Sequence, residues 1–371
     1  MPSMILLNHM DKFNKILEED AILISKRVNL EELLGKQLII TGASGLIGIN
    51  FLMSLKEFSR KNKKQKLPQI TAIFYNDVPK YFKEILNFEN LTIKIGDITD
   101  QGFVDSFPEG DYIIHAAGYG QPGKFMQDKI KTIAINTAAT LYLLKKLKAG
   151  GKFLFLSTSE VYSGLSNPPF RENQIGTTNT THPRACYIEG KRCCEAICNI
   201  YFEKGILARS ARLSLAYGPG TKPGDMRVLN SFIEKGLTGK IEMMDQGEAK
   251  RTYCYVSDAV EMMWNILLFG RQPVYNVGGF SDVTIAGLAN KIGKLLNAEV
   301  VTPTNEGEEG TEVSRPNVPP HDRKIIGAPD DVRLDMSLAA EEFKKRKNDY
   351  VSLDEGLKKT IEWQKELYKI K

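Results

Sequence analysis

The sequence predicts an α/β protein built on a doubly wound parallel sheet, with a smaller α/β lobe toward the C-terminus. Short apolar strands alternate with helical stretches from Gly35 to about residue 217, which is the order of a parallel sheet covered by helices on both faces. After Gly220 the segments become irregular and mix short strands, helices and loops. A chain of 371 residues is long enough for one large core and a dependent lobe.

The elements follow in order along the chain. Residues 1–34 read as a helical arm, because apolar side chains recur through it at helical spacing. Helices are also predicted at Ile49–Leu55 and at about 185–204. The six strands of the sheet are predicted at Gln37–Thr41, Ile70–Tyr75, Leu91–Ile95, Tyr112–His115, Lys152–Ser157 and Ala208–Ser214.

These elements divide the chain into three parts. The arm covers residues 1–34, a nucleotide-binding domain covers 35–217, and 218–371 form mainly a substrate-binding lobe that interleaves with the domain. Within the lobe, 305–331 are rich in proline, glycine and charge, which predicts a long loop.

Composition excludes several classes of protein. A net charge of +5, dispersed over 50 basic and 45 acidic residues, does not predict a nucleic-acid partner. No stretch reaches the roughly 18 consecutive apolar residues of a membrane span, so no membrane partner is expected. The five cysteines lack the paired spacing and histidine partners of a metal site. We therefore expect a cytoplasmic protein without a bound metal.

A glycine-rich turn predicts a dinucleotide site. Gly42, Gly45 and Gly48 follow an apolar strand and precede a helix, so the chain can turn tightly and aim backbone N–H groups at a pyrophosphate. The next strand ends at Asn76 and Asp77, either of which can bind the adenosine ribose. No lysine or arginine lies in the turn, which favours NAD over NADP. The doubly wound sheet is therefore expected to be of the Rossmann type.

A second group of residues predicts acid–base chemistry. Tyr187 and Lys191 lie four residues apart on one face of a predicted helix. A nearby ammonium stabilises a phenolate, so Lys191 is expected to lower the pKa of Tyr187 and make it a base. Lys191 is also placed to hold the nicotinamide ribose. Thr158 and Ser159 end a strand, where hydroxyls can bind a substrate alcohol.

These motifs together resemble those of extended short-chain dehydrogenases/reductases of the nucleotide-sugar epimerase/dehydratase family, from about Gly35 to Leu357. Several local stretches are most similar to UDP-glucuronate decarboxylases, notably STSEVY, PRACYIEGKR and RTYCYVSDAV. The other matching segments are ITGASGLIG, GDITD, HAAG, INTAAT and AYGPG.

The resemblance implies a role for each matching residue. The catalytic residues would be Thr158, which polarises the sugar O4, Glu160 at the sugar, and the pair Tyr187 and Lys191. Substrate contacts would come from Ser159, Tyr217, Arg227, Arg251 and Arg333, with Arg251 at the diphosphate. Besides Tyr187 and Lys191, NAD would contact Gly42, Ser44, Gly45, Leu46, Ile47, Gly48, Asn76, Asp77, Asp97, Ile98, Ala116, Ala117, Gly118 and Asn136.

The resemblance also implies an activity and an assembly. The enzyme would oxidise a nucleotide sugar to a 4-keto intermediate, with UDP-glucuronate decarboxylation as the nearest precedent. Three departures bear on the reaction: Ser159 replaces the aspartate of 4,6-dehydratases, Arg333-Leu334-Asp335 replaces an Arg-x-Pro-Asp run, and Leu215 replaces an asparagine. A 4,6-dehydratase, a 4-epimerase, a 4-dehydrogenase or a non-catalytic NAD sensor remain alternatives. Members are commonly homodimers joined by four helices, here the Tyr187 helix and that near Lys131–Lys148, with Ile133, Leu141, Leu143 and Leu144 as apolar positions.

Overall fold

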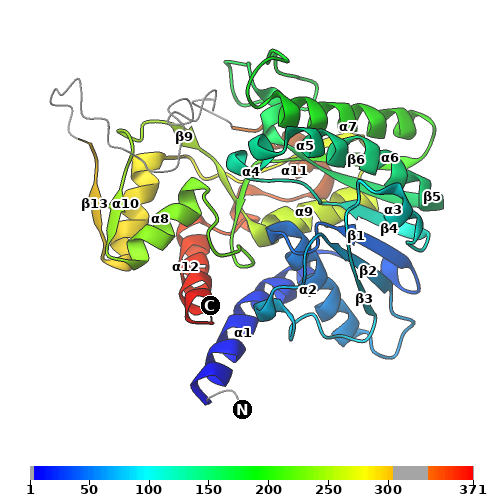
Figure 1. Cartoon of the computed structure of the whole chain (residues 1–371), viewed down its shortest axis with the longest axis horizontal. Coiled ribbons are helices and arrows are strands. Elements are labelled where there is room, and N and C mark those ends of the chain that lie inside the picture. The colour runs from blue at the N-terminus through cyan, green and yellow to red at the C-terminus, as the bar shows by residue number, and fades with distance from the viewer. Residues whose placement is uncertain (1–3, 304–332, 371) are drawn as a thin grey trace.

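A seven-stranded parallel sheet forms the centre of the molecule, as the computed structural model of residues 4–303 and 333–370 shows (Figure 1). Its strands run in the order β11-β6-β5-β4-β1-β2-β3, and every neighbouring pair is parallel. The predicted fold class is therefore confirmed. The strands are β1 (Gln37–Thr41), β2 (Gln69–Phe74), β3 (Leu91–Ile95), β4 (Gly110–His115), β5 (Leu147–Thr158), β6 (Leu207–Leu213) and β11 (Val274–Val277).

Alternate side chains of the sheet enter two separate cores. Leu38 and Ile40 of β1 face the core shared with α2 (Leu46–Lys61) and α9 (Val256–Phe269). Ile39 between them faces the opposite core, as the two-residue period of a strand requires. That second core is closed by α3 (Gln101–Asp105), α6 (Ala138–Lys145) and α7 (Ala185–Glu203), with α5 (Lys129–Asn136) packed on α7.

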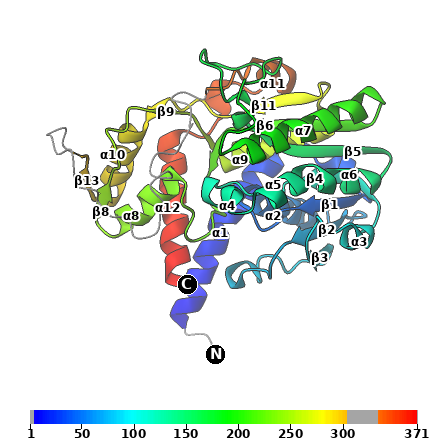
Figure 2. The same ribbon diagram turned by 45° about the horizontal axis from the view of Figure 1, so that its top comes forward.

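The N-terminal helix α1 (Met4–Arg27) is an integral layer of the fold rather than a projecting arm. It packs on α2, α9 and the C-terminal helix α12 (Leu353–Ile370), and Figure 2 shows α1 and α12 side by side. Phe13 and Leu17 are fully buried, and the ring of Phe13 stacks on Trp363 at 3.9 Å between centroids. The two ends of the described chain therefore stabilise one another.

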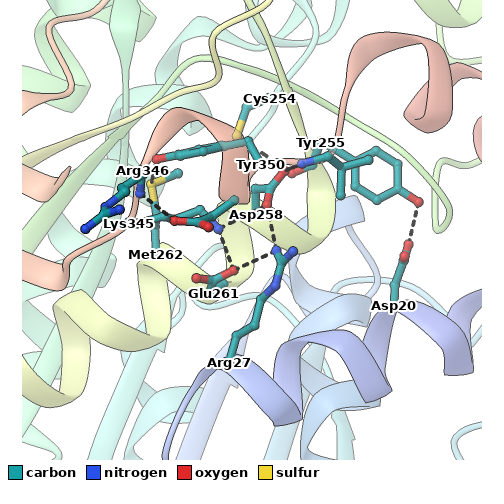
Figure 3. Close-up of polar contacts among 12 residues, drawn as sticks. Asp20, Arg27, Cys254, Tyr255, Asp258, Glu261, Met262, Lys345, Arg346 and Tyr350 are labelled. Atoms are coloured by element: carbon teal, nitrogen blue, oxygen red, sulfur yellow. Dashed lines mark hydrogen bonds and ion pairs between the residues drawn. The ribbon is translucent and has the colours of Figure 1, made fainter.

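A buried ionic cluster fastens α1 to α9 and to the segment before α12 (Figure 3). Lys345 Nζ lies 2.5 Å from Glu261 Oε2 and 3.1 Å from Asp258 Oδ1. Arg27 Nη1 approaches the same two carboxylates at 3.1 Å. The backbone N–H of Val351 donates to the other oxygen of Asp258. Two carboxylates on one helix thus bind cations from both ends of the chain.

The smaller lobe lies beside the sheet and is built from the second half of the chain (Figure 1). α12 packs against both of its helices, α8 and α10. Because β11 and α9 return from this half to the sheet, a boundary at 217 does not separate the sheet from the lobe. The lobe comprises α8 (Val228–Leu237), α10 (Ile285–Leu296) and the strand pairs β8 (Lys240–Glu242) with β13 (Glu299–Val301) and β9 (Lys250–Arg251) with β12 (Val283–Thr284).

Short elements complete the described structure. They are α4 (Pro122–Gln127), α11 (Ser337–Phe343), the strand pair β7 (Leu215–Tyr217) and β10 (Tyr253–Tyr255), and the 3-10 turns Glu31–Leu33, Lys80–Phe82, Ser159–Tyr162 and Lys347–Asp349. Within 4–303 and 333–370, no helix has the length and apolar character needed to cross a bilayer. The loop predicted at 305–331 lies outside the described residues.

Candidate active site

The glycine turn sits at the carboxyl end of β1 and leaves no room for side chains. Gly42 has φ +67°, and a Cβ on it would lie 2.4 Å from the carbonyl oxygen of Ala116. A Cβ on Gly48 would lie 2.3 Å from the carbonyl oxygen of Gly42. Gly45 occupies the N-cap of α2, so Leu46 and Ile47 begin the helix with unsatisfied N–H groups. This cradle fits the pyrophosphate of a dinucleotide.

A lysine from the lobe reaches the glycine turn, which the sequence did not predict. Lys222 Nζ lies 3.0 Å from Ser44 Oγ. Its segment is held on α2 because Asn50 donates to the carbonyl of Pro219 at 2.9 Å. The turn itself has no basic residue, but the fold adds one that is 178 positions away in sequence.

The residues predicted for the adenosine lie at the ends of β2 and β3. Asn76 and Asp77 are exposed just beyond β2. Asp97 follows β3 and is ion-paired with Lys131 of α5 at 2.6 Å. Burial alone would raise the pKa of Asp97, but hydrogen bonds from Lys131 and Thr99 outweigh it and lower the pKa. Lys131 was not predicted, whereas the buried Ile98 lies next to Asp97 as expected.

The end of β4 connects the cofactor turn to the catalytic helix. His115 is fully buried between Thr41 Oγ1 and the carbonyl of Ile135. Burial and the charge of Lys191 lower the pKa of His115 to about 3, so it is neutral and structural. Ala117 donates its N–H to the same Thr41 hydroxyl. A Cβ on Gly118 would lie 3.6 Å from Lys191 Nζ, so this loop adjoins the predicted ribose position.

Asn136 is the other predicted cofactor residue near the catalytic helix. Its Nδ2 donates to the carbonyl of Thr132 at 2.7 Å, and a Cβ on Gly190 would lie 3.5 Å from its side chain. Its Oδ1 is buried without a hydrogen-bond partner among the described residues. Such an orphan acceptor beside α7 is available to a bound group or an ordered water.

Tyr187 and Lys191 lie on one face of α7, and both are buried. Burial and Glu160 raise the pKa of Tyr187 to about 12, against the opposing effects of Thr158, Arg184 and Arg227. The predicted net lowering of this pKa is therefore wrong for this structure. Lys191 Nζ donates instead to the carbonyl of Leu156 at 2.7 Å, and burial lowers its own pKa to about 8.

Glu160 lies in the turn after β5, near Tyr187, and is paired with an arginine that the sequence did not single out. The Glu160 N–H donates to Thr158 Oγ1 at 3.2 Å. Its carboxylate accepts from Nη2 of Arg184, the N-cap of α7. Arg184 precedes Tyr187 by three residues, so its place in the first turn of the catalytic helix was a signal that could have identified it.

A buried hydrogen-bond network joins α7 to β5 and β6. Glu195 continues the face of Tyr187 and Lys191 by one further turn and binds Arg212 of β6 through both oxygens. It also accepts a hydrogen bond from Ser157. Arg212 donates to the hydroxyl of Tyr162, which is fully buried. Tyr162 is therefore part of the buried core and helps to hold Arg212 in place.

The predicted substrate contacts fall in different surroundings. Arg227 is ion-paired with Asp225 at 2.6 Å, and its charge lowers the pKa of Tyr187. Ser159 is buried beside Thr158. Arg333 accepts a backbone hydrogen bond from Phe170, and Arg251 lies on β9 and donates to the carbonyl of Lys250.

Tyr217 is not available to a substrate, so its predicted role is wrong. It is 2% exposed and packs edge-on against Tyr253 and Tyr255. A Cβ on Gly356 would lie 2.2 Å from its hydroxyl oxygen, so α12 closes over the ring. Tyr217 belongs to the core between the sheet and the lobe.

Comparison with known proteins identifies relatives of this chain. Residues 38–278 match the model of the NAD dependent epimerase/dehydratase family. The chain is 30% identical over 333 residues to UDP-glucuronic acid decarboxylase 1 of Xenopus tropicalis, covering 88% of this chain and 72% of that protein. It is 28% identical over 321 residues to UDP-glucuronic acid decarboxylase 6 of Arabidopsis thaliana, covering 84% and 89%.

Solved structures share the fold at lower identity. An epimerase of Methanothermobacter thermautotrophicus superposes with a TM-score of 0.72 at 19% identity, covering 100% of this chain and 98% of its own. A dTDP-glucose 4,6-dehydratase of Streptomyces venezuelae, with NAD bound, gives 0.71 at 21% identity, covering 89% and 97%. These likenesses establish the extended doubly wound architecture.

Proposed function

Because the chain belongs to the NAD-dependent epimerase/dehydratase family and is an NAD-dependent enzyme, we propose that it converts a nucleotide sugar through a 4-keto intermediate. We further propose that the net reaction is decarboxylation of UDP-glucuronate. The observation that supports this most is the gathering of Thr158, Glu160 and Tyr187 at one site, with Lys191 one turn further along α7. NAD, when bound, accepts the hydride from C4 and returns it.

The chain's own residues supply the proton chemistry. Tyr187 takes the proton of the C4 hydroxyl as C4 is oxidised and gives it back when the ketone is reduced. Thr158 hydrogen-bonds the same oxygen and is already coupled to Tyr187. Lys191, held on the carbonyl of Leu156 beside the Gly118 loop, binds the nicotinamide ribose. In this proposal the pyrophosphate is bound by the cradle of Gly42, Ser44, Gly45, Leu46, Ile47 and Gly48. The adenosine is bound by Asn76, Asp77, Asp97 and Ile98. The rest of the cofactor site is lined by Ala116, Ala117, Gly118 and Asn136.

Decarboxylation fits the side chains next to Thr158 better than dehydration does. In a 4-keto uronate, the C6 carboxylate is β to the ketone, so carbon dioxide leaves while its bonding electrons form the C4–C5 enolate. A proton then adds at C5, and no acid is needed for the leaving group. Loss of water would instead require a proton donor at the C6 hydroxyl, and Ser159 stands where an aspartate would serve.

Three arginines are proposed to bind the anionic parts of the substrate. Arg251 would hold the diphosphate, Arg227 would approach the sugar from the start of α8, and Arg333 would lie near the C6 carboxylate. Of the three, Arg227 is supported by its effect on Tyr187, because its charge lowers the pKa of that side chain. The β-bridge between Phe170 and Leu334 brings Arg333 near the segment that follows the Ser159–Tyr162 turn.

We also propose a cytoplasmic homodimer. Ile130 and Ile133 of α5, Leu141 of α6 and Ile200 of α7 are exposed at 40% or more on the helical side opposite α2. Leu143 and Leu144 face the sheet core and cannot contribute. All five cysteines are free thiols, which suits a reducing compartment. Sedimentation of wild type and Ile130→Glu would test the dimer, which the charged variant should dissociate.

The reaction is tested by incubating the protein with NAD and UDP-, GDP-, CDP- and dTDP-sugars in heavy water. Mass spectrometry should show loss of carbon dioxide from UDP-glucuronate and one deuterium at C5 of the product. Tyr187→Phe should still bind NAD and should lower turnover by at least about 10²-fold, as expected for losing a general base. Loss of water, epimerisation or accumulated NADH would each replace decarboxylation with another activity. A Tyr187→Phe protein that keeps the wild-type function would indicate an NAD sensor.

A further inference from the structure

The ion pair between Arg184 and Glu160 lies near Tyr187 in the proposed active site. The side chain of Arg184 is 8% exposed, and its Nη2 donates to Glu160 Oε1. Arg184 Nε and Glu160 Oε2 are both buried without hydrogen-bond partners among the described residues. Buried groups of this kind are costly unless they are satisfied by a ligand or a water. The pair therefore has unused donor and acceptor capacity at the proposed sugar site.

Arg184 also contacts the catalytic tyrosine indirectly, through an aromatic ring. Its guanidinium carbon lies 5.5 Å from the centroid of Phe125. The Phe125 ring stacks on the Tyr187 ring at 4.5 Å with an interplanar angle of 5°. One arginine thus contacts both the carboxylate next to the base and the ring that packs against the base. A cation over an aromatic face is attracted to the ring.

Charge balance explains why the arginine is needed. Burial raises the pKa of Glu160, and Arg184 opposes that rise through its charge and its hydrogen bond. The groups that act on Tyr187 are Glu160, Thr158, Arg184 and Arg227. Arg184 acts on both Glu160 and Tyr187, so its removal would alter both the orientation of the carboxylate and the environment of the base.

We propose that Arg184 is a positioning residue for the sugar chemistry: its guanidinium fixes the Glu160 carboxylate in the turn after β5, while its face holds Phe125 against Tyr187. The proposal rests on the proposed function for its kinetic consequence, but the pairing itself is independent of it. Held by Arg184, Glu160 is placed to orient the sugar or to exchange a proton with it.

The pairing is tested without turnover, by titrating Glu160 in the NAD-loaded protein. Carbon-13 label in glutamate side-chain carboxyls gives a spectrum in which Glu160→Gln identifies the Glu160 resonance. In Arg184→Gln the titration midpoint should rise by about 1 to 3 pH units, the usual effect of losing an adjacent cation. Arg184→Lys should return part of the shift. An unchanged midpoint in Arg184→Gln would overturn the proposal whatever the enzyme's activity.

The kinetic consequence is tested by a double-mutant cycle with UDP-glucuronate. Arg184→Gln should lower kcat by about 10- to 100-fold with little change in KM, and Arg184→Lys should recover part of the loss. Because both residues act as a unit, Arg184→Gln should add little when Glu160→Gln is already present. Arg60→Gln, which removes the exposed partner of Glu57 far from the site, is the control and should leave kcat unchanged.

The outcomes separate the two hypotheses. Wild-type protein that converts no sugar, together with a shifted Glu160 titration in Arg184→Gln, would refute the proposed function and retain the pairing. Active wild type with additive losses in the cycle would refute the positioning role. If Arg184→Gln unfolds, the neutral double variant with Glu160→Gln should fold better than the single one, because no unpaired buried carboxylate remains. A double variant that folds no better would also refute the pairing.

Discussion

Replacing Lys345 by methionine should destabilise the protein through the ionic cluster that joins both ends of the chain (Figure 3). The Lys345 ammonium is 4% exposed and binds Asp258 and Glu261, which are 1% and 8% exposed. Its loss would leave two buried carboxylates to share Arg27, which is 28% exposed. Removing one partner of a buried ion pair costs about 3–5 kcal/mol. We expect about 3 kcal/mol, because Arg27 and the Val351 N–H remain.

Urea denaturation followed by fluorescence would measure this change as a shift in midpoint at constant slope. Lys291→Met is the matched control, since Lys291 pairs with Asp354 at a similar distance of 2.7 Å but both side chains are exposed. Exposed pairs contribute about 0–1 kcal/mol. Adding Asp258→Asn to Lys345→Met should recover part of the stability. A loss below about 1 kcal/mol in Lys345→Met would refute the reasoning, because the cluster would then behave like a surface pair.

Two further predictions concern the cofactor turn and the contact between α1 and α12. Lys222→Gln should weaken NAD binding by about tenfold in calorimetry, and more at low salt, because a cation is lost at the pyrophosphate cradle; unchanged affinity would place Lys222 outside the cofactor site. Burial raises the pKa of Asp20 from 3.8 to about 6, against the opposing effects of Lys359 and Tyr255. The folded protein therefore retains a proton that the unfolded chain releases across this window, and the free energy of unfolding falls as the pH rises through it. Relative to Asp20→Asn, that fall should reach about 3 kcal/mol between about pH 3 and pH 7, and parallel stability curves for the two proteins would contradict the assignment.

The sheet could be predicted from the sequence because its signals are local. Apolar runs such as Gln37–Thr41 and Leu91–Ile95 match the observed strands at both ends. The seventh strand, Val274–Val277, has only four residues and follows a segment of irregular texture. Its place beside β6 depends on α9 crossing the sheet, and this is a tertiary relation that no local pattern contains.

The candidate site was predictable where spacing along one element determines the geometry. Tyr187 and Lys191 share a helix face, and Thr158 and Glu160 share a strand end. Lys222 could not be predicted, since it meets the glycine turn only after the lobe folds back onto α2. Tyr217 was predicted wrongly as a substrate contact. Its AYGPG motif predicts a turn, but the ring is buried because α12, distant in sequence, packs over it.

The electrostatics of the base show why spacing alone is insufficient. Four residues along a helix set Tyr187 and Lys191 on one face, but the ammonium lies over the ring of Phe155 at 4.5 Å and binds the carbonyl of Leu156. The opposing effects on the phenol come from other elements: Thr158 and Arg184 lower its pKa, and Glu160 raises it. A change that neutralises Glu160 should therefore lower the pKa of Tyr187. Removal of Arg184 instead changes the pKa of Tyr187 directly and also changes that of Glu160, which itself acts on Tyr187. The strength of the base is a property of the assembled site, and the double-mutant cycle rather than any single substitution is what can resolve it.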